Sequence, residues 1–203
     1  VIAGTGAGQV RSNGRFIAAY NYTGIQTNIT NAVNNILQAL PANSEFEYDT
    51  NMNGIQYPVN VNVFASVAGG SGSGMLIDVL SLINAALSNL ALNYNLYPWL
   101  FLPEVFRAMS TGPAMANVLY NTYGALNCLD YIQQLDVDKT PVDFNHTVIK
   151  DKLFNYAYVI NNLNRAGISF DRLDDLADVV AKCAFLPANK MGDELQSPFD
   201  NIV

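Results

Sequence analysis

The alternation of apolar and polar positions along the chain predicts strands and helices that follow one another in turn. Valine and alanine alternate with polar residues from position 59, which is the spacing of a strand, and longer apolar stretches recur at helical spacing. Gly24 is a weak point within the first of these helices. The predicted strands cover residues 59–68, 97–103 and 153–162, and the predicted helices cover residues 16–40, 75–92, 113–134 and 170–185.

This order of elements predicts an α/β fold with three layers. Strands that alternate with helices form a mostly parallel, Rossmann-like sheet with helices on both faces. Residues 1–3 read as the end of a further strand, residues 41–57 as an Asn-rich polar excursion, and residues 186–203 as an irregular tail. We see no internal repeat or second domain, so residues 1–203 are interpreted as one partial domain.

Composition and charge exclude several classes of partner. The net charge is −7, only 13% of the 203 residues are charged, and no lysine or arginine occurs between Arg15 and Arg107. A basic surface for nucleic acid or anionic lipid is therefore not expected. The apolar segment 75–92 carries Asp78 and several polar residues, which favours a buried helix over a membrane span. Cys128 and Cys183 lack metal-ligand spacing, so we predict no metal site and a reducing, cytoplasmic location.

A glycine-rich loop, AGGSGSG, joins the strand that begins at residue 59 to the buried helix. Glycines let backbone N–H groups approach a ligand, and the helix N-terminus behind them favours an anion such as phosphate. The sequence of the loop does not match a Walker loop, a nucleophile elbow or a dinucleotide fingerprint. The alternative interpretation is a flexible strand-to-helix turn that binds no ligand. The candidate phosphate-binding residues of this loop are Ala68, Gly69, Gly70, Ser71, Gly72, Ser73 and Gly74.

A second glycine loop, GAGQVRSNGRF, lies near the start of the chain, with Arg11 and Arg15 beside it. AGGSGSG resembles the tubulin/FtsZ signature [SAG]GGTG[SA]G, with Ser71 in place of threonine, and the first loop resembles GAGNNWAKGHY of β-tubulin. The two loops are further apart than in tubulin, and residues 41–57 are the implied insertion. In that family both loops enclose the nucleotide phosphates, which adds Gly6, Ala7, Gly8 and, as a counter-charge, Arg11 to the candidates; a solvated surface arginine is the alternative.

The resemblance also implies residues that read guanine. YVINN is similar to the strand ends YCIDN of tubulins and VIPN of FtsZ, which places Asn162 at the base, with Asn161 as the alternative register. The next helix supplies Phe170 to stack on guanine and Asp174 to contact its edge, with Asp178 as the competing register. A loop asparagine and a helix-capping carboxylate are the alternatives. The segment LYNTYGAL, residues 119–126, is similar to the helix start PYNATLS of tubulin.

The resemblance implies a divergent, prokaryotic-style protein that binds GTP or GDP, with or without Mg²⁺, and self-associates into filaments. Hydrolysis in the family needs an acidic loop from the next subunit, and its NxDxx[DE] pattern is missing here; Asp193, Glu194 and Asp200 are the candidates, and the catalytic residue is unknown. The family's first phosphate loop is expected upstream and its second domain downstream. The alternatives are a non-hydrolysing nucleotide-binding scaffold and an unrelated α/β enzyme with another phosphorylated ligand.

Overall fold

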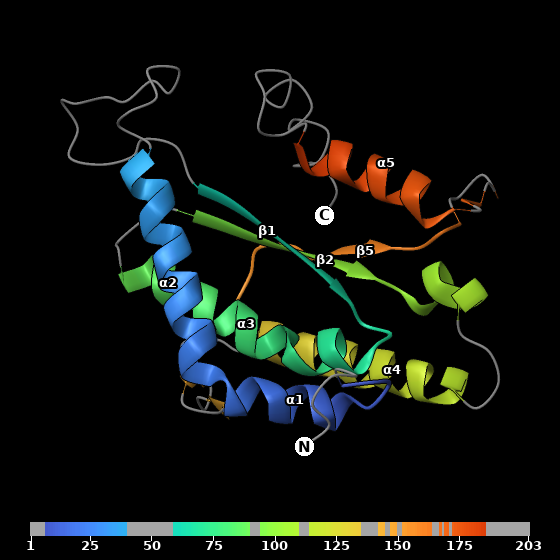
Figure 1. The fold of residues 1–203 in the computed structure, drawn as a ribbon, viewed down its shortest axis with the longest axis horizontal. Coiled ribbons are helices and arrows are strands. Elements are labelled where there is room, and N and C mark those ends of the chain that lie inside the picture. The colour runs from blue at the N-terminus through green and yellow to red at the C-terminus, as the bar shows by residue number, and fades with distance from the viewer. Residues whose placement is uncertain are drawn as a thin grey trace.

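A computed structural model of the chain contains five α-helices, one 3₁₀ helix and five strands in the part that it describes (Figure 1). It describes residues 7–39, 59–89, 94–109, 114–134, 142–144, 147–149, 152–163, 167, 169–170 and 172–185. The elements are α1 (Arg11–Tyr20), α2 (Tyr22–Ala39), β1 (Val59–Ser66), α3 (Gly70–Asn89), β2 (Tyr94–Phe101), the 3₁₀ helix η2 (Pro103–Met109), α4 (Ala114–Gln133), β3 (Val142–Phe144), β4 (Thr147–Ile149), β5 (Tyr158–Ile160) and α5 (Leu173–Phe185).

The main sheet has three parallel strands in the order β1-β2-β5. Each parallel connection runs through helices, with α3 between β1 and β2 and α4 between β2 and β5. The expected parallel α/β sheet is therefore confirmed. The antiparallel pair β3-β4 was not expected, because strands of three residues are too short to leave a periodic signal.

Both faces of the sheet are covered, and β2 shows why. Leu96 and Leu100 point into a core with Leu76, Leu80 and Leu129 of α3 and α4. The intervening residue Trp99 packs instead with Leu176 and Val180 of α5. Side chains alternate between the faces of a strand, so an apolar strand with both faces buried predicts helices on both sides. Figure 1 shows α1, α3 and α4 on one side of the strands and α5 on the other, which confirms the three layers.

An aromatic row crosses the sheet on the α5 side. Phe64, Trp99 and Tyr158 are register partners on the three strands, and their rings stack with centroid distances of 5.7 Å and 4.2 Å. The indole N–H of Trp99 donates to Asn62 Oδ1 at 2.9 Å. Burial, reinforced by the neighbouring Tyr156, raises the pKa of the Tyr158 phenol. This row ties the strands together where backbone pairing with β5 spans only three residues.

The glycine loop and the helix behind it form one continuous element. The helix predicted to begin at residue 75 begins at Gly70, so AGGSGSG supplies its first turn as well as the preceding loop. In the described part of the chain, α3 alone is long and apolar enough to span a membrane, but 56% of its apolar window is buried inside the protein. Its buried residues, which include Leu80 at 0% exposure, make it the core helix that the sequence predicts.

The single helix predicted over residues 16–40 is two helices. The break lies at Asn21, whose backbone (φ −100°, ψ 14°) leaves the helical region and whose side-chain amide donates to the carbonyl of Ile17 at 2.9 Å. Asparagine competes for backbone partners in this way and ends helices. The weak point that we expected at Gly24 instead lies within the first turn of α2.

Replacing Gly24 with alanine is expected to stabilise the protein by about 0.5–1 kcal/mol, because glycine in a helix is entropically costly. A Cβ atom built at Gly24 meets nothing within 4 Å, so no clash opposes this gain. Urea unfolding measures the change, and Gly167→Ala, at a φ of +78°, is the opposite control that should destabilise. A lower unfolding free energy for Gly24→Ala would contradict the geometry of α2.

Other boundaries also differ from the prediction, for example β2, which covers Tyr94–Phe101 and not residues 97–103. The strand expected over residues 153–162 is confined to Tyr158–Ile160, because Asn155 exchanges hydrogen bonds with Leu96 through its backbone N–H (3.0 Å) and its side-chain oxygen (2.9 Å). The helix expected from residue 170 begins at Leu173. The connection between the predicted strand that ends at residue 103 and the predicted helix that begins at residue 113 contains the 3₁₀ helix η2. Residues 1–3, 41–57 and 186–203 lie outside the described residues, as do Gly6, Asp193, Glu194 and Asp200.

Candidate phosphate-binding site

The two glycine loops meet at the carboxyl end of β1. The loop after β1 enters α3 at Gly70, and the loop around Gly8 enters α1 at Arg11. The backbone N–H of Gly70 donates to the carbonyl of Gly8 at 3.0 Å, so the loops are bonded directly although 62 positions separate them in the sequence. The two loops that contain the residues predicted to bind phosphate therefore lie side by side in the structure, as far as those residues are described.

The glycines of these loops fall into two groups. At Gly14, Gly70, Gly72 and Gly74 an added Cβ would overlap backbone atoms of the opposite segment: the carbonyl of Gly70 for Gly14, and Val10, Ser66 and Arg11 for the others. These four let α1 and the end of β1 lie against α3. Gly8, in the left-handed region at φ +56°, and Gly69 have nothing within 4 Å of an added Cβ. Among the glycines of these loops that the structure describes, these two therefore border open space that a ligand could enter.

The two serines of the loop also differ. The hydroxyl of Ser73 is buried and donates to the carbonyl of Gly69 at 2.6 Å, which closes the first turn of α3. Ser71 is exposed. A ligand at the loop would therefore meet the hydroxyl of Ser71, whereas Ser73 shapes the loop.

Backbone donors at the start of α3 are available to an anion. Gly69, Ser71 and Gly72 form no backbone N–H hydrogen bond with another described residue. The first turn of α3 contains no acidic residue, so no side chain of that turn competes with an anion for these donors. Orphan N–H groups and the positive end of the helix dipole attract phosphate without a lysine.

Asn121 of α4 is hydrogen-bonded to both glycine loops through its side chain. Its side-chain amide donates to the carbonyls of Gln9 and Ala68, both at 3.0 Å, and its Oδ1 accepts the backbone N–H of Arg11 at 3.1 Å. Only 5% of the residue is exposed. We did not single out this residue from the sequence, although the similarity of LYNTYGAL to a tubulin helix start marked its segment.

Arg11 lies along α4 and α3. Its Nε donates to the carbonyl of Ser73 at 3.1 Å, its Nη2 approaches Cys128 Sγ at 3.2 Å, and its side-chain stem packs against Gly124. Two donors of the guanidinium are therefore used within the fold. The role of Arg11 as a counter-charge to phosphate stays a prediction, and its observed contacts join α1 to both neighbouring helices.

The predicted guanine readers lie beyond β5. The backbone N–H of Phe170 donates to the carbonyl of Asn162 at 2.9 Å, so these two residues are adjacent in space. The Phe170 ring is partly buried against the cluster of Trp99, Leu176 and Val180. Asp174 is exposed and forms a surface ion pair with Arg172 at 3.5 Å. Their contact with a base stays a prediction.

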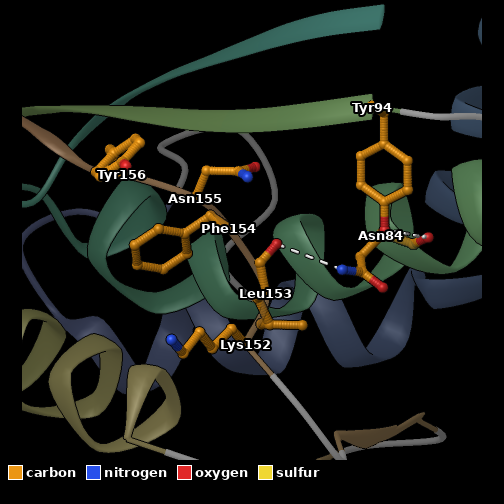
Figure 2. Close-up of a pocket in the computed structure, with 7 residues that line it drawn as sticks. All are labelled: Asn84, Tyr94, Lys152, Leu153, Phe154, Asn155 and Tyr156. Atoms are coloured by element: carbon orange, nitrogen blue, oxygen red, sulfur yellow. Dashed lines mark hydrogen bonds between the residues drawn. The ribbon is translucent and has the colours of Figure 1, made fainter. Parts of the chain in front are cut away.

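A separate hollow of about 450 Å³ lies at the amino end of β2, where Tyr94 begins the strand, and therefore at the opposite end of the sheet from the glycine loops (Figure 2). Asn84 of α3 donates to the carbonyl of Leu153 at its rim, at 3.4 Å. None of the predicted site residues lines it. Within the described ranges there is also no group of three histidine, cysteine or acidic residues placed to hold a metal ion.

The fold and the paired loops define an α/β protein with glycine-rich strand-to-helix turns at the carboxyl edge of a parallel sheet. A family model described as tubulin like matches residues 1–202, and the chain belongs to this tubulin-like family. No curated protein and no solved structure matches the chain. Tubulin-like proteins in general bind GTP and self-assemble.

Proposed function

We propose that this chain binds a guanine nucleotide, with the phosphates on the two glycine loops, as part of a protein that assembles with copies of itself. The observation that carries the proposal is the direct bond from Gly70 to Gly8, which joins both loops beside the open backbone donors of α3. Neutral N–H groups and the hydroxyl of Ser71 are the phosphate ligands, so the site needs no lysine.

The bound nucleotide is GTP or GDP, with or without Mg²⁺. Asn162, Phe170 and Asp174 are proposed to read the base: Phe170 by stacking, and the carboxylate of Asp174 by accepting hydrogen bonds from guanine N1–H and its exocyclic amine. Support comes from the backbone bond that places Phe170 beside Asn162 and from the exposure of Asp174. The two cysteines, both free, accord with a cytoplasmic location.

Replacing Asp174 with alanine is expected to weaken GTP binding roughly 10-fold or more, because a hydrogen bond to a charged acceptor is lost. Binding of ATP should not change. Calorimetric titration with both nucleotides measures this, and Asp178→Ala, one turn further along α5, is the matched control. Tighter binding of ATP than GTP by the unaltered protein would reject guanine recognition. A larger loss of GTP affinity in Asp178→Ala than in Asp174→Ala would assign the contact with the base to Asp178.

Hydrolysis is proposed to require assembly, because the catalytic acid of this family comes from the adjacent subunit. A GTP turnover rate that rises steeply with protein concentration supports this proposal. Tight GTP binding with no turnover at any concentration favours the alternative, a non-hydrolysing nucleotide-binding scaffold.

A further inference from the structure

Asn121 lies where the two glycine loops can be fixed relative to each other. The carbonyls that it holds belong to Gln9 and Ala68. Gln9 directly follows Gly8 and Ala68 directly precedes Gly69, and these two glycines are the ones that border open space. A single side chain is therefore bonded next to both edges of the proposed phosphate site.

Only a carboxamide satisfies the three groups around this position. It offers two N–H donors for the two carbonyls and one oxygen for the N–H of Arg11. Aspartate would keep the acceptor but would place a carboxylate against two carbonyl oxygens. Serine has one short hydroxyl and reaches fewer of these groups. Asparagine at 121 therefore matches the chemistry of the loops, and its burial makes each unmade bond costly.

We infer that Asn121 is a positioning residue that sets the spacing of the two glycine loops and thereby the affinity of the site for phosphate. This inference rests on the proposed nucleotide-binding function. Thr122, the next residue, strengthens the attachment: its hydroxyl lies 3.2 Å from the carbonyl of Val67 and 2.9 Å from that of Val118. Helix α4 is thereby fixed to the end of β1 where the loop begins.

The test compares Asn121→Ser and Asn121→Asp with Asn117→Ser and Asn117→Asp, which change an exposed asparagine of the same helix. GTP affinity should fall about 10-fold or more in both Asn121 variants and stay unchanged in the Asn117 variants. Lower pH should partly restore Asn121→Asp, because a protonated carboxyl regains one donor, and burial beside carbonyls raises the pKa of that carboxyl. Asn121→Ser should show no such recovery.

Amide hydrogen exchange without nucleotide provides the second readout. Loss of the bridge should speed exchange at both loops, residues 8–10 and 68–74, and not only in α4. Wild-type affinity for GTP and unchanged loop exchange in the Asn121 variants would overturn the inference, as would equal losses in the Asn117 variants. If the unaltered protein fails to bind GTP, the proposed function fails, while loop exchange still decides whether Asn121 positions the loops.

Discussion

Replacing Ser71 with aspartate is expected to lower the affinity for GTP by about 10- to 100-fold, which corresponds to a repulsion of roughly 1–3 kcal/mol between two nearby negative charges. Ser71 is exposed in the first turn of α3, beside the open glycine Gly69. A carboxylate there would occupy the position that we propose for a phosphate. Titration of both proteins with GTP at low ionic strength measures the difference.

The same substitution should leave the fold as stable as before or more stable by about 0.3–1 kcal/mol, because a carboxylate favours the positive end of a helix dipole. The first turn of α3 has no acidic residue that would oppose it. Stability and binding should therefore move in opposite directions. This separation is informative because general damage to the loop would lower both.

Asn89→Asp is the matched control for the added charge. Asn89 is exposed and ends the same helix, about 27 Å from Ser71 at the rise of an α-helix. GTP affinity should be unaffected there. If Ser71→Asp binds GTP as tightly as the unaltered protein, the phosphates do not lie at the N-terminus of α3, and the proposed site is wrong.

The sequence predicted the layers of the fold better than the ends of its elements. Apolar strands with both faces buried, such as the one that contains Leu96 and Trp99, leave a strong signal for helices on both sides of the sheet. The helix break at Asn21 depends on one side-chain bond to Ile17 and leaves no periodic signal. The start of β5 was predicted too early for a similar reason, because Asn155, which precedes the strand, bonds to Leu96 outside the ladder.

The sequence predicted which residues form the candidate phosphate site. It did not predict which of them face a ligand and which pack against a neighbouring backbone segment. The positions of glycines in a sequence do not distinguish a glycine that faces a ligand from one that lets a neighbouring backbone segment approach. Only the three-dimensional contacts assign Gly8 and Gly69 to the first kind and Gly70, Gly72 and Gly74 to the second. The bridge through Asn121 was equally hidden, since it joins groups 53 to 112 positions apart.

Among the glycines that pack against a neighbouring backbone segment, Gly14 is the one where we expect a substitution to have the largest effect. It lies on α1, and an added Cβ would overlap the carbonyl oxygen of Gly70. The obstacle is backbone on both sides, so no side chain can turn away to make room. Alanine here must push α1 from α3 and break the bond between Gly70 and Gly8 that joins the loops.

Gly14→Ala is therefore expected to destabilise the protein by about 3 kcal/mol or more, at or above the upper end of overpacking costs, and to abolish measurable GTP binding in the fraction that folds. Gly69→Ala is its counterpart: a methyl group meets nothing there, so stability should stay within about 0.5 kcal/mol, while the methyl group obstructs the approach of phosphate. Urea unfolding and GTP titration of the two variants measure both effects. Equal stability losses in the two variants would show that α1 and α3 do not approach through Gly14. Intact binding in Gly69→Ala would place the nucleotide elsewhere.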